Sequence, residues 1–525
     1  MIRKIVAYLF LLLSIVLSSS VLYAQHMAYS VDLRETQATG LIPVIAHVTG
    51  IHDSTAVFQM SIWSPGSYGL WQGKNYVEQF KAADSTGQAL SVDQSGLFQW
   101  TVSDPLKLAT ISYTINTRVL AASDELNVAA HVDSNGLLAN GTVLFGWLAN
   151  HKNISSSVNV LFPDTCELAT NLDPAADQLQ VKPENKYRQT IFAAQDFAQL
   201  ADAVILTSPD LNVSEFNISG ARYIVAISSD DEALLDSIVQ STKAIARTTQ
   251  RFFSRTPFTS YFAFYHVAPG LTTTNVLPHA NASAYLIEDG EWAEVRRSLL
   301  PNLARSLFAA WDGYEIKSYL LAPPDYRDTI RATSLWFVNG TQRYYAAMML
   351  TRAGLMRSED FNGMLENWVA RMYANEPQDS TSLEQLANSI GQLSARERNY
   401  FESRSTLTAL AMDLEIRSQT DDESSLDQVM IILDAKAHHG KTIIDRSLTD
   451  SLSLAAGVDL KAFRARYVAG HDPLPLDSYV KLMGLLMQPA TQARSVNFRV
   501  SDGSTSTQRL RRIAMLAPRK NATFR

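Results

Sequence analysis

The sequence predicts a multidomain α+β protein, with an N-terminal antiparallel β-sandwich followed by a mainly helical domain. Three observations support this fold class. The chain has 525 residues, which is too long for a single hydrophobic core. Its first half contains short, alternating, β-branched runs, whereas its second half repeats apolar residues at helical spacing. With 46% apolar and 18% charged residues, the composition is that of a globular protein.

The first 24 residues have the composition of a secretory signal peptide. Arg3 and Lys4 precede an apolar run from residue 5 to residue 17, and small residues lead to Ala24. The apolar run is too short for a stable membrane span. We therefore expect cleavage near Ala24, a periplasmic or secreted protein, and no membrane span in the mature chain.

Residues 25–212 are predicted to form the β-sandwich domain. Alternating runs such as residues 44–48 and 109–115 indicate half-buried strands. The turn signals Ser134-Asn135-Gly136 and Asn140-Gly141 are typical of hairpins. Evenly spaced short strands of this kind favour a sandwich.

Residues 213–488 are predicted to form the helical domain. Thr381 and Glu384 have the spacing of a capping box ahead of an apolar run. Apolar periodicity predicts helices at about residues 292–311, 333–355, 359–374, 399–418 and 425–438.

Residues 489–525 are predicted to be a basic C-terminal tail, because eight Lys and Arg residues follow residue 493 and Asp502 is the only acid among them. We expect this tail to be solvated or frayed at its end. The whole chain has a net charge of −7, which argues against nucleic acid as a partner. The single cysteine, Cys166, excludes an intrachain disulfide and any multi-cysteine metal site.

Common catalytic motifs are missing from the sequence. No His is followed by Glu, and neither a nucleophile elbow nor a phosphate-binding glycine loop occurs. Residues 64–69 place a Ser between glycines without the elbow spacing, which favours a turn. His266 and His279 fall in a strand-and-loop region, where an isolated His usually serves as a hydrogen-bonded polar group.

Several segments, taken in order, nevertheless resemble one family across most of the mature chain. They are Trp63-Ser64-Pro65-Gly66-Ser67-Tyr68, Asp84-Ser85-Thr86-Gly87, His279-Ala280-Asn281-Ala282-Ser283, Trp311-Asp312, Leu335-Trp336-Phe337 with Gly340, Arg352-Ala353-Gly354-Leu355 and Tyr467-Val468-Ala469-Gly470. In this order they resemble the glycyl aminopeptidases, which are metallopeptidase family 61. The resemblance implies a thermolysin-like, gluzincin-type helical domain that binds zinc.

The resemblance also implies where the zinc site would be. The family binds zinc with two His and uses a Glu as general base, in the pattern H-E-x-x-H on a helix, and a Glu from a second segment completes the site. Aligned on Trp311, the two His positions are Arg305 and Ala309, and the general-base position is Ser306. The third ligand position is Asn339.

None of these four side chains suits the family's chemistry. Arg stays protonated, Ala has no donor atom, and a neutral amide oxygen is a poor zinc ligand. We therefore expect no metal and no cofactor here, and we assign no catalytic residue. The family's substrate-anchoring Glu is replaced by Pro278 beside His279, and its oxyanion-stabilising Tyr aligns with Glu402, although a shift of one residue would bring Tyr400 closer to that role. The family's usual PDZ module is not expected, because the stretch after Leu485 is too short for one.

These observations leave three functional hypotheses. The first is a pseudopeptidase that binds a peptide or another anionic ligand in a cleft relined by Arg305, Ser306, Ala309, Asn339, His279 and Glu402. In the alternative interpretation of Arg305, its guanidinium only pairs with a neighbouring acid such as Asp312 or Glu315. The second hypothesis is a structural or partner-binding exported protein that uses its β domain or basic tail. The third is an active aminopeptidase or hydrolase with a non-standard site, for instance a carboxylate pair drawn from Asp325, Asp328 and Glu315.

Overall fold

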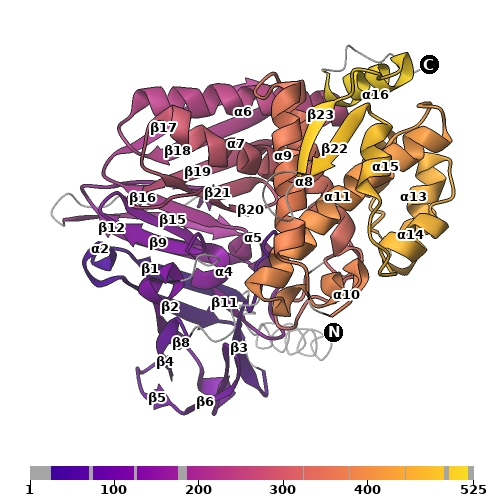
Figure 1. Cartoon of the computed structure of the whole chain (residues 1–525). Helices are drawn as coiled ribbons and strands as arrows, with labels where there is room; N and C mark the ends of the chain where they lie inside the picture. The colour runs from indigo at the N-terminus through magenta and orange to yellow at the C-terminus, as the bar shows by residue number, and fades with distance from the viewer. Residues whose placement is uncertain are drawn as a thin grey trace, which may run out of the picture.

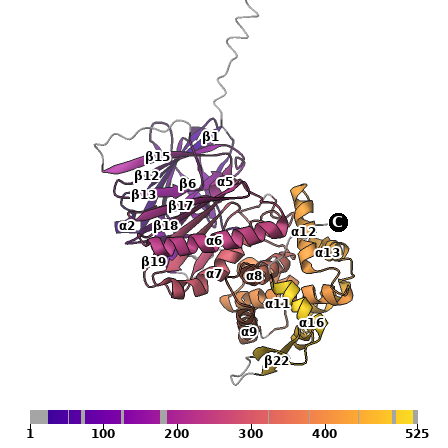
Figure 2. The same ribbon diagram turned by 90° about the horizontal axis from the view of Figure 1, so that it is seen from above.

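The computed structural model describes residues 25–51, 53–69, 75–122, 127–175, 186–322, 324–377, 379–443, 445–489 and 496–517. The predicted signal peptide, with its cleavage point near Ala24, lies outside these residues. Figures 1 and 2 show β-sheets in the N-terminal half and helices in the C-terminal half, so the predicted α+β class is confirmed. No helix in the described ranges has both the length and the apolar character that crossing a membrane requires.

The N-terminal half contains three sheets. The largest has eight strands in the order β14 (Asp173–Pro174), β15 (Tyr187–Ala194), β12 (Ser156–Pro163), β1 (His26–Asp32), β2 (Leu41–Thr49), β8 (Thr110–Asn116), β4 (Val77–Ala83) and β5 (Ala89–Leu90). Two four-stranded sheets have the orders β13 (Glu167–Thr170), β16 (Val204–Ser208), β10 (Gly136–Asn140), β9 (Ala130–Asp133) and β11 (Gly146–Leu148), β3 (Ala56–Met60), β7 (Gln99–Val102), β6 (Val92–Gly96).

Two details of this half differ from the sequence prediction. The sandwich is not wholly antiparallel, because β1 pairs with β12 in parallel. Asn140-Gly141 is not a hairpin turn: β10 ends at Asn140 and the short helix α4 (Gly141–Leu144) begins there. A Cβ on Gly141 would lie 1.7 Å from the carbonyl oxygen of Leu200, so this glycine allows a close approach to α5 (Phe197–Ala201) instead. The predicted turn at residues 134–135 does join β9 to β10.

A five-stranded sheet opens the second half, in the order β17 (Leu211–Ile218), β18 (Ala221–Ser228), β19 (Ser260–Ala268), β21 (Ala282–Glu288) and β20 (Asn275–Pro278). β17 begins before the boundary predicted after residue 212. The helices α6 (Glu232–Phe253) and α7 (Trp292–Ala309) pack against this sheet, as Figure 2 shows. The sheet that contains β10 and β16 also packs against the five-stranded sheet. The buried side chains at this contact include Leu138, Leu206, Phe264, Ala284 and Leu286.

The remaining helices form a bundle beside this sheet. They are α8 (Leu335–Arg352), α9 (Ser358–Ala374), α10 (Leu383–Asn388), α11 (Ala395–Gln419), α12 (Leu426–His438), α13 (Leu448–Ala456), α14 (Lys461–Tyr467) and α15 (Leu476–Lys481). The five helices predicted from apolar periodicity correspond to α7, α8, α9, α11 and α12. The capping box of α10 is formed by Ser382 and Gln385 rather than by Thr381 and Glu384, one residue later than predicted.

The described part of the predicted basic tail, residues 496–517, is folded, and the end that was expected to fray lies outside the described residues. β23 (Val496–Val500) pairs with β22 (Leu485–Pro489), and α16 (Ser506–Leu516) buries Met515 and Leu516. Arg511 is buried and pairs with Asp422 at 2.8 Å, so this basic side chain is part of the protein interior and is not solvated. Arg494, Arg519, Lys520 and Arg525 lie outside the described residues.

The close packing of α8 on α11 depends on Gly340. A Cβ at this position would lie 2.3 Å from the carbonyl oxygen of Ser405 on α11, closer than any tolerated contact. The glycine therefore sets the spacing between Asn339 and Arg343 on α8 and Glu402 on α11.

We expect Gly340→Ala to lower the free energy of unfolding by about 3 kcal/mol. The added methyl group would clash with the backbone of Ser405, which cannot move aside as a flexible side chain could. Gly363→Ala on α9 is the matched control, since a Cβ there would contact nothing within 4 Å. The control should raise stability by up to about 1 kcal/mol through helix propensity. Urea unfolding of both variants measures the difference, and equal effects would show that the α8–α11 contact is not tight.

Candidate functional site: an arginine-lined cleft

The positions singled out from the sequence lie on two neighbouring helices. Arg305 and Ala309 are one turn apart on α7, so they share a face. Asn339 lies in the first turns of α8, and Arg343 follows it one turn later. The two helices pack against each other, which brings Arg305, Asn339 and Arg343 to one cavity.

This cavity, called here the cleft cavity, lies between the two halves of the chain and has a volume of about 150 Å³. The β half contributes the turn at residues 64–67, which was predicted as a turn but not as part of a site. The other lining residues come from β20, α7, α8, the segment before α11, and α11 itself: Val276, Leu277, Arg305, Asn339, Arg343, Ile390, Arg398 and Glu402, together with Val128 and Ala129.

A second and larger cavity, called here the helix cavity, opens among α7, α8, α9 and α11 and has a volume of about 920 Å³. Arg305, Arg343 and Glu402 line both cavities, so these three side chains lie where the two meet. The walls of the helix cavity are partly apolar, with Leu300, Ala346, Leu350, Met356, Met364 and Trp368.

Glu402 is surrounded by positive charge. Its carboxylate oxygens lie 2.5 Å from Arg343 and 3.8 Å from Arg371 of α9. Burial favours the neutral acid, but the attraction of Arg343, Arg305, Arg371 and Arg398 outweighs it and lowers the pKa of Glu402. Glu402 is therefore an ionised acceptor at neutral pH.

Arg305 makes neither an ion pair nor a hydrogen bond within the described residues. Glu402 attracts it electrostatically, but the carboxylate oxygens of Glu402 lie 2.5 Å from Arg343 and 3.8 Å from Arg371. Burial, and then repulsion from Arg343, lower the pKa of Arg305 to about 10. The guanidinium still carries its charge at pH 7. The Arg305 side chain is half-buried and makes no ion pair in the described structure, so its charge would stabilise a further anion at this point.

The acids named as alternative partners for Arg305 have other contacts. Asp312 is buried, accepts a hydrogen bond from Thr341, and has a pKa raised well above its usual range by burial. Glu315 lies 3.3 Å from Arg255. The structure therefore does not support the interpretation that Arg305 is neutralised by either acid.

Three of the predicted site residues do not line the cleft cavity or the helix cavity. Ser306 donates its hydroxyl hydrogen to the carbonyl of Asn302 at 2.7 Å, and Ala309 is fully buried. The His279 ring lies 3.0 Å from Asp202 and 2.7 Å from Asn140, so it fastens β20 to the N-terminal half. Arg305, Asn339 and Glu402 are the predicted residues that the structure brings together.

Other candidates also lie elsewhere. Tyr400 lines a separate hollow with Arg404 and Glu376. Asp325 pairs with Arg327 in an exposed turn, Glu315 pairs with Arg255, and Asp328 accepts the backbone hydrogen of Thr329.

Sequence reasoning missed Arg343, Arg371 and Arg398. Two of them could have been found, because Arg343 follows Asn339 by four residues on one helix and Arg398 precedes Glu402 by four on another. Arg371 belongs to a third helix, and no local pattern connects it with the others.

The residues that the resemblance aligns with the family's zinc positions do not fit a zinc ion. Zinc is bound by Cys, His and carboxylate donors. Arg305 and Ala309 supply none, the Asn339 amide oxygen is a weak donor, and Glu402 is held by arginines. The described residues contain one group of three metal-ligating side chains, and it includes none of these positions.

Comparison with known proteins identifies the family. Residues 28–208 match the M61 peptidase N-terminal domain, and residues 300–411 match the M61 glycyl aminopeptidase domain. The chain belongs to the M61 glycyl aminopeptidase family. The second match contains both Arg305 and Asn339. No curated protein matches the chain in a sequence search.

Solved structures of other proteins share this fold. An aminopeptidase N family protein from Idiomarina loihiensis has a TM-score of 0.75 at 19% identity, covering 91% of this chain and 82% of its own. A mutant M1 zinc metallopeptidase from Deinococcus radiodurans has a TM-score of 0.53 at 12% identity, covering 86% and 95%. The same mutant bound to a Tyr-Ser-Ala substrate has a TM-score of 0.51 at 13% identity, with the same coverage. At these identities the likeness concerns the fold.

The different surroundings of Arg305 and Arg343 lead to opposite expectations for their removal. Arg305→Met should raise the free energy of unfolding by up to about 1 kcal/mol, because it removes a half-buried charge that makes no ion pair in the described structure. Arg343→Met should lower it by about 2 kcal/mol, because it takes the nearest partner from Glu402. Thermal melts of the two variants at pH 7 test this, and a destabilised Arg305→Met would mean that Arg305 is compensated.

Proposed function

We propose that this M61 family member is a non-catalytic pseudopeptidase that binds a carboxylate-bearing peptide and does not cut it. The proposed binding cleft is the space where the cleft cavity and the helix cavity meet at Arg305. The observation that supports this most directly is Arg305, a charged side chain without an acid partner at the first zinc-ligand position of the family. A guanidinium is matched in shape and charge to a carboxylate.

The balance of charge in the helix cavity supports an anionic ligand. Five arginines line it, Arg296, Arg297, Arg305, Arg343 and Arg371, against two acids, Asp360 and Glu402. Both acids already have arginine partners. The apolar walls formed by Leu350, Met364 and Trp368 suit the side chains of a peptide.

The absence of catalysis follows from the chemistry of the side chains. Hydrolysis by this family would need a Lewis acid and a base that activates water. Neither Arg305 nor Asn339 binds zinc well, and the Ser306 hydroxyl donates a hydrogen bond to the carbonyl of Asn302. The proposal therefore includes no zinc at this cleft and no general base.

The proposal also includes export. A basic start at Arg3 and Lys4, an apolar run and a cleavage point near Ala24 favour a periplasmic or secreted protein.

The β half offers less support as a binding surface. The edge strands β5 and β14 of its largest sheet have two residues each, and such short edges are poor templates for strand addition. Its exposed large apolar residues, Ile45, Leu97 and Leu106, lie on separate segments. We therefore place the ligand in the cleft.

The binding test uses two tripeptides that differ only in a free carboxylate or an amide at the C-terminus. We expect the acid to bind at least about tenfold more tightly than the amide, because only the acid can form a charge-assisted pair with Arg305. Arg305→Met should remove this preference. Arg327→Met, at an exposed pair with Asp325, is the matched control and should retain it. Equal binding of both peptides by the wild type, measured by calorimetry, would contradict the proposal.

The second test concerns zinc at the cleft. The combined change Arg305→His, Ser306→Glu, Ala309→His and Asn339→Glu restores the family's ligands and base. We expect this variant to bind one more zinc per chain than the wild type, counted by elemental analysis. The wild type should not hydrolyse glycyl and alanyl anilides with zinc present. Hydrolysis that Arg305→Met abolishes would overturn the proposed loss of catalysis.

A further inference from the structure

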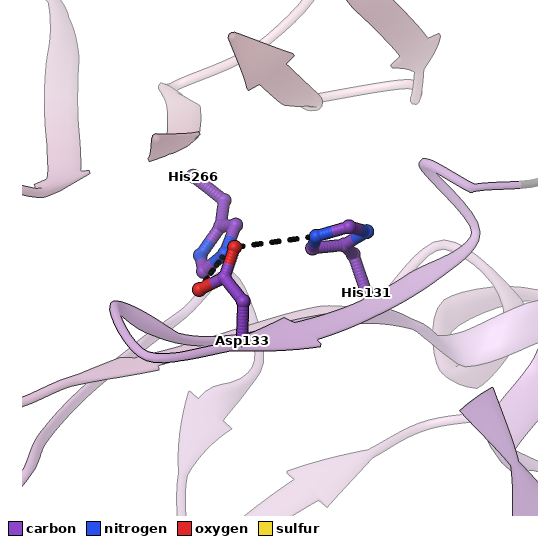
Figure 3. A group of neighbouring side chains, drawn as sticks. All are labelled: His131, Asp133 and His266. Atoms are coloured by element: carbon purple, nitrogen blue, oxygen red, sulfur yellow. Dashed lines mark hydrogen bonds and ion pairs between the residues drawn. The ribbon is translucent and has the colours of Figure 1, made fainter. Parts of the chain in front are cut away.

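A cluster of His131, Asp133 and His266 lies away from the cleft, where the two halves of the chain meet. His131 and Asp133 belong to β9 of the N-terminal half, and His266 belongs to β19 of the five-stranded sheet. Figure 3 shows the carboxylate of Asp133 between the two rings. Its oxygens lie 3.2 Å from His131 Nε2 and 3.1 Å from His266 Nε2.

The arrangement brings three donor atoms of the right kind together. The two ring nitrogens and the carboxylate oxygen all lie within 4.8 Å of one another. The alternation of side chains along β9 explains part of this geometry, because residues 131 and 133 point to the same face. The third donor comes from a strand 133 residues later in the chain.

Neighbouring groups hold two of the three side chains in place. Ser228 Oγ accepts the backbone hydrogen of Val267 at 3.0 Å and lies 3.2 Å from His266 Nδ1, which directs Nε2 toward Asp133. The backbone N–H of Asn135 donates to Asp133 at 2.8 Å. Outer contacts of this kind orient the ligands in metal sites.

The hydrogen bonds within the cluster use only one of the two ring nitrogens of His131. Its Nδ1 is buried without a hydrogen-bond partner in the described chain, although buried polar atoms normally have one. His131 and Asp133 are about one-fifth exposed, whereas His266 is fully buried. The cluster is thus open to solvent on one side, where a water could complete a coordination shell.

We propose that His131, Asp133 and His266 bind one divalent cation of the zinc class and thereby tie β9 to β19. Two imidazoles and one carboxylate favour zinc, cobalt or nickel over calcium and magnesium, which prefer oxygen ligands. Three protein ligands and one water make a tetrahedral site. A cation bound only by the folded chain stabilises it.

The test titrates Co²⁺ and Zn²⁺ into the metal-free mature protein. We expect one equivalent of Co²⁺ to produce the intense visible absorption of a tetrahedral site, Zn²⁺ to displace it, and Zn²⁺ to raise Tm by a few degrees. His131→Ala and Asp133→Asn should each weaken binding by about 100-fold or more, and Ser228→Ala, which acts only through His266, by about tenfold.

His151→Ala is the matched control. His151 also pairs with an aspartate, Asp53 at 2.7 Å, but belongs to no described group of three metal-ligating side chains. Its removal should leave Co²⁺ binding unchanged. Two results would overturn the proposal: no stoichiometric binding by the wild type, or binding that survives both His131→Ala and Asp133→Asn. Because Ser228→Ala keeps all three ligands, a weakened affinity there separates metal binding from a purely structural role.

Discussion

The packing of one β-sheet against another at the junction of the two halves is the contact on which the rest of the structure depends. Leu138 and Leu206 of the N-terminal half meet Phe264 and Leu286 of the five-stranded sheet in a fully buried layer. Apolar burial of this kind is non-directional, so polar contacts must fix the orientation of the two sheets. The His279 contacts with Asp202 and Asn140, and the cluster of His131, Asp133 and His266, lie along this junction.

The cleft owes its character to this junction and to a change of charge. The turn at residues 64–67 closes over α7 only because the two halves are docked, and Gly66 accommodates the carbonyl of Pro278 there. In a zinc peptidase the positive charge at the centre is the metal. Here Arg305, at the position that the resemblance aligns with a zinc ligand, supplies a positive charge, but a guanidinium binds anions and cannot polarise water as a metal does. In the proposed function, the site therefore attracts carboxylates and lacks the means to cut.

Fold and chemistry therefore point in different directions. The M61 matches and the shared fold describe how the chain is built. Function depends on side chains at a few positions, and a scaffold can keep its packing when they change. Gly340 illustrates this, because the contact of α8 with α11 constrains that residue whether or not a metal lies beside it.

The sequence by itself determined the two halves and the main helices, and it predicts which residues stand at the family's zinc positions. These features follow from local periodicity and from short motifs such as Leu335-Trp336-Phe337, which one segment carries alone. Only the tertiary structure decided that Ser306, Ala309 and His279 lie outside the cavities, that Arg343 and Arg371 converge on Glu402, and that His266 meets Asp133. It also decided that the chain near Arg511 folds back onto the body. Such contacts join elements far apart in the chain, and packing sets their geometry, which no local pattern encodes.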